Sequence, residues 1–166
     1  HIAAIRGLSE MAADNQAVGG PATLMLDTDT SVNAHTWNAA LRAAGAALAA
    51  TDAVIGGEME NAFCAVRPPG HHATRKQAMG FCFFNNVALA AKYALMRHQL
   101  QRVAIVDFDV HHGNGTEDIC AGDPHILMCG IFQHPFYPFS GDKNPADNML
   151  NVPVPAYTKG MDIREI

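Results

Sequence analysis

Ionisable side chains gather in one short stretch of the chain, "VDFDVHHGNG" at residues 106–115. The stretch begins at the end of an apolar run, 102–109, that is typical of a buried strand. Because successive strand side chains point to opposite faces, we expect Asp107, Asp109 and His111 to share one side. Three groups that can accept protons or bind metals are thereby predicted to converge.

The chemistry of these three residues favours a bound cation. Two carboxylates about 7 Å apart on a strand repel one another unless a cation or a donor relieves them. Asp109 and His111 offer an oxygen and a nitrogen ligand suited to Zn²⁺ or another divalent metal, with Asp107 as an acceptor behind them. Gly113 and Gly115 are expected to let the chain turn sharply. The alternative is a solvated strand end whose Asp and His reflect only loop propensity.

A second histidine pair lies in another segment with the same pattern. The stretch "RPPGHHA" at 67–73 follows the apolar segment 61–66, which we expect to be a strand. Its tandem His71 and His72 would then also emerge at the carboxyl end of a strand. Carboxyl ends of parallel strands meet at one edge of a sheet, where α/β folds bind ligands. The two clusters are therefore predicted to form one site.

The elements that must position these residues alternate between helical and extended patterns. Helices are expected at 1–14, 34–50 and 84–98, with a short one after "HHGNG", and strands at 23–27, 61–66, 102–109 and 125–132. Prolines and glycines predict a long loop at 67–80, and no final element is expected in the tail, 133–166. Such alternation predicts an α/β fold with a parallel sheet covered on both faces.

Composition limits the class of protein. The 166 residues are 49% hydrophobic and 16% charged, which fits one globular domain with a core. A net charge of -5 gives no electrostatic support for direct binding to nucleic acid or to an anionic membrane. No window reaches the roughly 18 apolar residues of a membrane span.

The four cysteines predict a reducing compartment. Cys64, Cys82, Cys120 and Cys129 form no CxxC pair and lie in apolar stretches, so we expect buried thiols and a cytoplasmic protein. The chain starts at His1, without a Met, which suggests a start partway into a larger protein.

Three long motifs carry a family resemblance. The segments "RPPGHHA", "GFCFFNNVALAAKY" and "VAIVDFDVHHGNGTEDI" together resemble the zinc-dependent histone deacetylase superfamily, which includes acetylpolyamine amidohydrolases and bacterial deacetylase-like proteins. The Arg-Pro-Pro and the Asn of "HHGNG" resemble its class II branch, and the likeness runs from 24 to about 154. It implies an arginase/deacetylase-like parallel sheet. Residues 1–166 would be a single partial domain without the family's N-terminal strand and C-terminal part.

The resemblance implies a metal centre. Asp109 and His111 would bind Zn²⁺ together with an Asp beyond residue 166, where the family's catalytic Tyr would also lie. Relatives hold a structural K⁺ nearby, but Gly130 and Phe132 replace side chains that many relatives offer there. With two protein ligands out of three, the 166-residue chain alone is expected to bind zinc weakly and to be inactive.

The resemblance also assigns roles to the tandem histidines. His71 would be supported by Asp107, and His72 by Asn114, a position that is often Asp in relatives. A carboxylate raises the pKa of its imidazole, whereas a neutral amide orients the ring with less charge stabilisation. We assign His72 as general base and then general acid, with His71 as electrostatic support.

A narrow substrate channel completes the implied site. Phe81 and Tyr137 match the paired aromatics that enclose the substrate's methylene chain, and Gly80 permits a close approach beside them. The expected substrate is an acylated lysine or an acylated polyamine. Phe81 could instead be simple core, given Phe83 and Phe84 beside it.

Three readings of function remain. The first is an active deacetylase, and the second is a non-catalytic acyl-binding module, which the retained histidines argue against. The third is a ureohydrolase of the arginase type with two manganese ions, which would need an Asp where Gly113 stands. In every reading, an uncovered edge of the partial sheet is expected to favour self-association.

Overall fold

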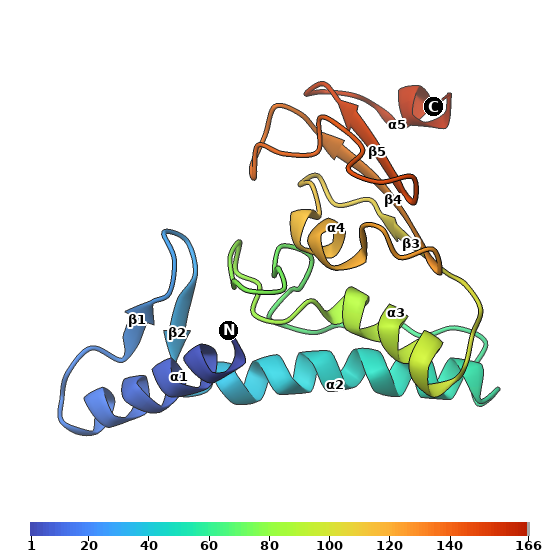
Figure 1. Cartoon of the computed structure of the whole chain (residues 1–166). Helices are drawn as coiled ribbons and strands as arrows, with labels where there is room; N and C mark the ends of the chain where they lie inside the picture. The colour runs from blue at the N-terminus through green and yellow to red at the C-terminus, as the bar shows by residue number, and fades with distance from the viewer. Residues whose placement is uncertain (166) are drawn as a thin grey trace.

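The computed structural model describes residues 1–165 and contains five helices and five strands in that range. In chain order they are α1 (Ile2–Ala17), β1 (Thr23–Met25), β2 (Ser31–Asn33), α2 (Thr36–Ile55), α3 (Asn86–Arg97), β3 (Val103–Asp107), α4 (Asn114–Cys120), β4 (Ile126–Gln133), β5 (Met149–Val154) and α5 (Gly160–Arg164) (Figure 1). The three expected long helices and the short one after "HHGNG" are confirmed.

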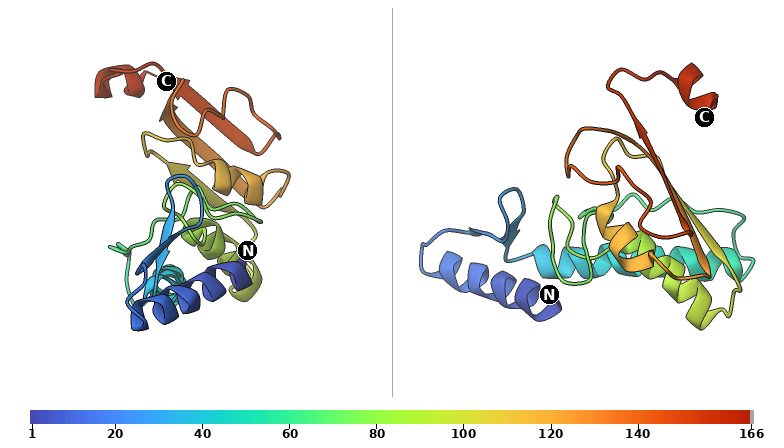
Figure 2. Two further views of the ribbon diagram at one scale, coloured as in Figure 1. Left: turned by 90° about the vertical axis from the view of Figure 1, so that its left-hand side faces the viewer. Right: turned by 45° about the horizontal axis from the view of Figure 1, so that its top comes forward.

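A parallel sheet of order β3-β4-β5 confirms the α/β class. Val103 is paired with Ile126, and Met128 with Met149. Between β3 and β4 the chain crosses over through α4, which is the connection that parallel strands require. The sheet lies above α2 and α3 in the left-hand view of Figure 2.

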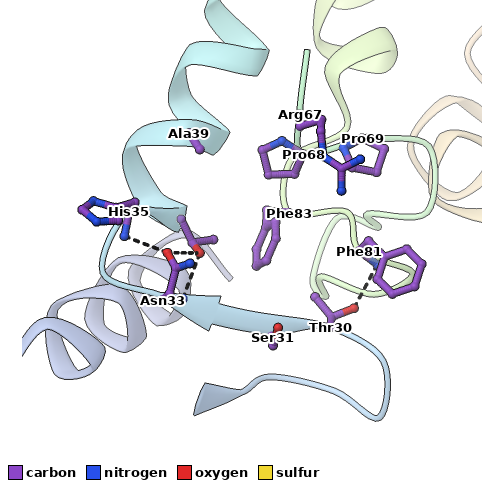
Figure 3. A pocket seen from close by; sticks show the side chains of 11 residues that line it. Thr30, Ser31, Asn33, His35, Ala39, Arg67, Pro68, Pro69, Phe81 and Phe83 are labelled. Carbon is purple, nitrogen blue, oxygen red and sulfur yellow. Dashed lines mark hydrogen bonds between the residues drawn. The ribbon is translucent and has the colours of Figure 1, made fainter. Parts of the chain in front are cut away.

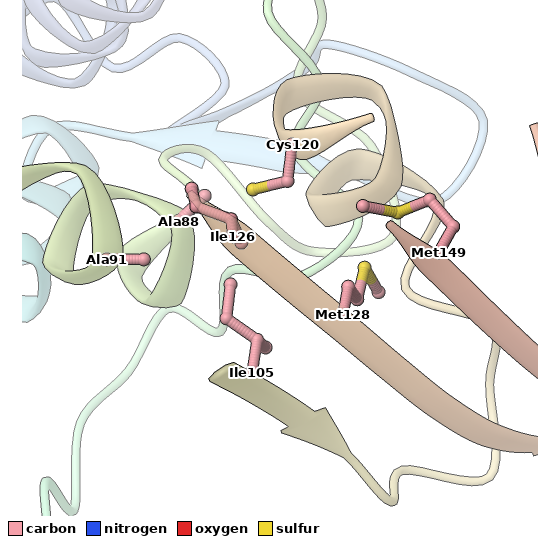
Figure 4. Close-up of a cluster of buried hydrophobic side chains, with 7 residues drawn as sticks. All are labelled: Ala88, Ala91, Ile105, Cys120, Ile126, Met128 and Met149. Carbon is pink, nitrogen blue, oxygen red and sulfur yellow. The ribbon is translucent and has the colours of Figure 1, made fainter. Parts of the chain in front are cut away.

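Small side chains let the helices approach one face of this sheet. Ala88 and Ala91 of α3 pack with Cys120 of α4 against the strand residues Ile105 and Ile126, joined by Met128 and Met149 (Figure 4). These side chains are almost fully buried, so their burial drives the docking of α3 and α4. The opposite face leaves Val106, Leu127 and Leu150 exposed.

The N-terminal part forms a second packed unit around a hairpin. The expected strand at 23–27 is shorter, β1, and pairs antiparallel with β2 instead of joining the parallel sheet. Its core contains Ile5, Val32, Ala40, Ala78 and Phe83. The hydroxyl of Ser9 in α1 donates to the carbonyl of Asn33 at 2.7 Å and accepts from the Trp37 amide at 3.2 Å.

Two expectations about strands are wrong. Residues 61–66 form no strand: Phe63 is 93% exposed, and a strand needs a neighbour to pair with its backbone groups. Conversely, the tail holds β5, whose apolar pattern is interrupted by Asn151 and Pro153. Proline is tolerated there because β5 is an edge strand.

The cysteines only partly follow expectation. Cys82 and Cys120 are buried and Cys129 is partly buried, whereas Cys64 is exposed because the 61–66 segment lies outside the core. All four are free thiols. Among residues 1–165, no helix combines the length and apolarity that crossing a membrane requires.

Candidate active site

Turns at the end of β3, and not strand alternation, bring Asp107, Asp109 and His111 together. The strand ends at Asp107, two residues earlier than expected. The Oδ1 atom of Asp107 then accepts from the Asp109 amide at 3.1 Å, and Oδ1 of Asp109 accepts from the His111 amide at 2.8 Å. Such side-chain-to-backbone bonds two residues apart are Asx turns, which fold the chain tightly. The three side chains still gather at the carboxyl end of the strand.

Asp109 and His111 place two possible metal ligand atoms, one oxygen and one nitrogen, close together. Asp109 Oδ1 lies 2.9 Å from His111 Nδ1. Two donors that close can bind one Zn²⁺ at usual ligand lengths of about 2.0–2.2 Å, so this pair fits a metal. Burial raises the pKa of the Asp109 carboxyl, but the hydrogen bonds from His111 and the charges of His71 and His111 together lower it more, so the net pKa is lowered. Residues 1–165 gather no set of three His, Cys, Asp or Glu side chains suited to a metal.

His71 is paired with a carboxylate. Its Nδ1 lies 2.8 Å from Asp107 Oδ2, and its Nε2 lies 3.9 Å from Asp109 Oδ1. Burial alone would lower the pKa of His71. The hydrogen bond and charge of Asp107 outweigh burial, so the pKa of His71 is raised.

His72 is paired with a neutral amide. Its Nδ1 lies 2.8 Å from Asn114 Oδ1, while the amide nitrogen of Asn114 donates to the Met79 sulfur at 3.4 Å. Because Oδ1 can only accept, His72 carries its proton on Nδ1 and keeps a lone pair on Nε2. Burial and the charge of His71, whose ring centroid is 4.1 Å away, lower the pKa of His72 to about 4.

Three glycines make this density of groups possible. A Cβ on Gly80, whose φ is +57°, would lie 2.4 Å from the His72 ring. A Cβ on Gly113 would lie 2.5 Å from Asp107 Oδ2, and one on Gly115 would lie 2.4 Å from the Ala73 carbonyl oxygen. Gly113 has an ordinary negative φ of -78°, so close approach, and not the expected sharp turn, requires glycine there.

A cavity of about 380 Å³ brings the tandem histidines, the Asp109–His111 pair and the expected channel residues together. Gly80, Phe81 and Tyr137 line it with His71, His72, Asp109 and His111. The Tyr137 ring centroid is 5.2 Å from that of His72, and the Phe81 side chain is 63% exposed. Phe81 is therefore a rim residue, and the alternative of simple core packing is wrong for it.

Two residues outside the sequence prediction, one in the cavity wall and one behind it, lie beside the aromatics. Asp29 lines the cavity, and Phe136 stacks on the His111 ring with centroids 5.0 Å apart. Burial, and then the charge of Asp29, raise the pKa of Tyr137 to about 12, so its hydroxyl stays neutral. Burial raises the pKa of Cys82 to about 11, which leaves it a wall residue rather than a nucleophile.

A neighbouring cavity of about 340 Å³ shares Phe81 and Pro69 with the site (Figure 3). Thr30 lines this second cavity and is buried. Its hydroxyl donates to Asp29 Oδ1 at 2.7 Å and accepts from the Phe81 amide at 3.1 Å. This hydroxyl therefore fixes both the acidic residue and the rim aromatic of the site.

His112 links two segments of the site, and the sequence pattern does not predict this link. Its buried ring bonds Ser140 Oγ through Nδ1 at 2.8 Å and Glu117 Oε2 through Nε2 at 3.2 Å. Ser140 follows the segment that holds Phe136 and Tyr137. His112 thereby ties the loop of the metal-type donors to the aromatic wall, and its place directly after His111 was the only signal.

Comparisons with known proteins show the family of the chain. The family model of the histone deacetylase domain matches residues 1–166. The chain is 46% identical over 123 residues to type-2 histone deacetylase 1 of Dictyostelium discoideum, covering 69% of this chain and 8% of that protein. It is 42% identical over 136 residues to the histone deacetylase-like amidohydrolase of Pseudomonas aeruginosa, covering 78% and 36%.

A solved structure gives the same result. The crystal structure of the HDA15 HD domain superposes with a TM-score of 0.81 at 34% identity, covering 92% of this chain and 44% of that one. The chain belongs to the histone deacetylase family. The chain spans about half the length, or less, of the relatives it matches. It is 46% identical over 143 residues to an uncharacterized Synechocystis protein, and this match covers 84% of the chain and 47% of that relative.

Proposed function

We propose that the protein carrying this chain is a zinc-dependent amidohydrolase that removes acetyl groups from lysine side chains or similar amines. The observation that supports it most is the contrast within one cavity. His72 is neutral and buried, while the Asp109–His111 donor pair lies in the same cavity. A neutral imidazole beside a metal-type donor pair is the arrangement that hydrolysis of an amide needs.

The chain's own residues have separate roles in the proposed hydrolysis. Zinc bound by Asp109 and His111 would supply polarisation of an acyl carbonyl and of water. His72 takes a proton from the attacking water at Nε2 and delivers it to the leaving amine. His71, with its pKa raised by Asp107, contributes positive charge close to the reacting carbonyl.

Asn114 and the channel residues orient the reactants. Asn114 holds the His72 ring by its Nδ1. Gly80 leaves space beside that ring, and Phe81 and Tyr137 bound the path of a methylene chain. A substrate with an apolar stem and a small terminal amide fits this path, which favours an acetylated lysine or an acetylated polyamine.

We further propose that the third metal ligand and the catalytic Tyr come from sequence outside these 166 residues, so that this chain is one partial domain. Tyr93 bonds Asp52 on the outside of the helices, and Tyr157 is exposed. Neither lines the cavity. The 166-residue chain alone is accordingly expected to be inactive.

Two other functions are supported less. A binding-only module would not need the paired histidines and their partners. An arginase-type centre would need a carboxylate at Gly113, where a Cβ meets Asp107 Oδ2 at 2.5 Å. A structural K⁺ site has little side-chain support: Gly130 offers no ligand, and the Phe132 ring packs on His112 with centroids 4.6 Å apart.

The proposed setting is the cytoplasm, with no direct nucleic-acid or membrane partner. Four free thiols suit a reducing compartment. The net charge of -5 gives no attraction for phosphate backbones or anionic lipid.

The test is hydrolysis by the protein expressed from its complete reading frame. We expect release of acetate from acetyl-lysine peptides or acetylated polyamines, loss of activity on chelation, and recovery with Zn²⁺. His72→Ala is expected to lower kcat by about 100- to 10,000-fold, the usual contribution of a general base. A zinc-loaded, folded protein that hydrolyses neither kind of substrate would contradict the proposal.

A further inference from the structure

The loop that carries the tandem histidines has no regular structure of its own. His71 and His72 lie in an irregular stretch at 67–80. A ring that must face a reacting atom therefore depends on whatever fixes the backbone around it. Two buried polar side chains from helix ends supply that support: Asn85 is 3% exposed and Thr116 is 0% exposed.

The Asn85 amide is fully used by hydrogen bonds. Its Oδ1 accepts from the Ala88 amide at 3.0 Å and caps α3. Its Nδ2 donates to the Ala73 carbonyl and to Thr116 Oγ1, both at 3.1 Å. The Thr116 amide, at the start of α4, donates to the His71 carbonyl at 3.1 Å. The backbone carbonyls of His71 and Ala73, the residues on either side of His72, are thus each held by the N-terminus of a different helix.

Close packing limits movement of the backbone around these hydrogen bonds. Gly115 lies so close to the loop that a Cβ there would be 2.4 Å from the Ala73 oxygen. Neither Asn85 nor Thr116 lines the cavity of the site. The Asn85 side chain bonds the loop directly, whereas Thr116 bonds the loop through its backbone amide and supports Asn85 through its hydroxyl. Because both are buried, water cannot replace a donor that is removed.

We infer that Asn85 and Thr116 are positioning residues that aim the His72 ring through its backbone. This inference deepens the proposed hydrolase function and rests on it. It assigns to "FNN" and to the Thr of "GNGT" a role in catalytic geometry beyond capping their helices.

The chain offers a matched control for the test. Asn148 is also an asparagine that spans several backbone groups: Nδ2 donates to the carbonyls of Cys120, Asp123 and Ile126, at the far end of α4. Asn85→Asp and Asn148→Asp each keep the acceptor oxygen and remove the donors. Thr116→Val removes a hydroxyl, and Thr116→Ser keeps it.

The experiment measures kcat, KM and the thermal midpoint for these variants of the complete protein on an acetyl-lysine peptide. Asn85→Asp and Thr116→Val are expected to lower kcat by about 10- to 100-fold, as a misplacement near 1 Å does, with little change in KM. Thr116→Ser is expected to restore kcat. Asn148→Asp is expected to lower the thermal midpoint and to leave kcat near the wild-type value.

Loss of kcat in Asn85→Asp and Thr116→Val no greater than in Asn148→Asp, at a comparable thermal midpoint, would overturn the inference. If Asn85→Asp does not fold, the Thr116→Val and Thr116→Ser pair decides. If the wild type hydrolyses no acetylated amine, the proposed function fails separately. The ring ¹⁵N signals of His71 and His72 then test positioning: Asn85→Asp should shift or double them and Asn148→Asp should not, and unchanged signals in both would overturn it.

Discussion

Two adjacent histidines of the same type carry opposite pKa shifts because their partners differ. Asp107 raises the pKa of His71, whereas burial and the charge of His71 depress the pKa of His72. The carboxylate partner and the amide partner therefore separate one charge-bearing ring from one proton-accepting ring. Asp107 raises the pKa of the first ring, whereas the hydrogen bond to the neutral Asn114, which also acts to raise the pKa of His72, does not offset burial and the charge of His71.

A carboxylate at position 114 should move this balance. Asn114→Asp is expected to raise the pKa of His72, because the new charge favours the imidazolium. A base works only when unprotonated, so the acidic limb of the kcat/KM profile should shift to higher pH by about one unit. As the pH is lowered, the variant should therefore lose activity before the wild type does. A profile that stays in place, or shifts to lower pH, would count against His72 as the base.

Gly80 should be intolerant of any side chain. Gly80→Ala adds a Cβ 2.4 Å from the His72 ring at a φ of +57°. It is expected to lower the free energy of unfolding by about 1–3 kcal/mol, as overpacking does, and to reduce kcat. Urea unfolding and steady-state kinetics measure the two effects. The control is Gly45→Ala in α2, which has open space and should stabilise by about 1 kcal/mol. Equal effects of the two substitutions would refute the steric argument.

At the scale of elements, Glu117 joins α4 to β5 and to the site loop. It accepts hydrogen bonds from His112 and from Asn151. Burial raises the pKa of the Glu117 carboxyl, but these two hydrogen bonds lower it more, so the net pKa is below the ordinary value of 4.5. A depressed carboxyl pKa stabilises the fold above pH 4.5, and that stabilisation is lost as the pH falls through the folded value.

Glu117→Gln replaces the titratable carboxyl with an amide, so the proton uptake that is linked to unfolding is lost. The variant is expected to be less stable than wild type at neutral pH, because the charge-assisted bonds are weakened. Between about pH 5 and pH 3, its free energy of unfolding should fall less than that of wild type. Denaturant unfolding across this range measures both. An unchanged pH slope would show that Glu117 does not carry the effect.

The sequence predicts elements well where one pattern dominates. The continuous apolar runs of β3 and β4 and the alanine-rich α2 follow directly from periodicity and propensity. β5 is hidden by Asn151 and Pro153, since an edge strand tolerates residues that a central strand does not. The segment 61–66 has the composition of a strand but no pairing partner in the described residues, and pairing is not a local property.

The site shows the same limit. Spacing predicts that residues 107, 109 and 111 converge, although Asx turns and not strand alternation bring them together. The roles of Asp29, Phe136 and His112 depend on contacts between segments distant in sequence. No local pattern marks these contacts.

At the scale of the whole molecule, β3 has an unpaired edge within residues 1–165, beside exposed apolar side chains. β3 pairs only with β4, and Ala104, Val106 and Phe108 are exposed. An apolar open edge invites pairing with another chain. We predict that the 166-residue chain self-associates through it.

Sedimentation velocity over a range of concentrations tests this prediction. The wild-type chain is expected to form dimers or larger species as concentration rises. Val106→Lys should shift the equilibrium to monomer, because a charge on an edge strand opposes pairing. The matched control is Leu127→Lys, which adds the same charge at another exposed position, on the central strand β4 and not on the open edge. A wild-type chain that remains monomeric would contradict the prediction.

The proposed hydrolysis depends most on a cation bound between the donors of Asp109 and His111, facing the tandem histidines. Anomalous diffraction at the zinc absorption edge, from crystals of the complete protein, tests this directly. We expect one peak within about 2.0–2.2 Å of a carboxylate oxygen of Asp109 and of Nδ1 of His111, in the cavity that His72 lines. A zinc peak bound elsewhere, or none at saturating zinc, would contradict it.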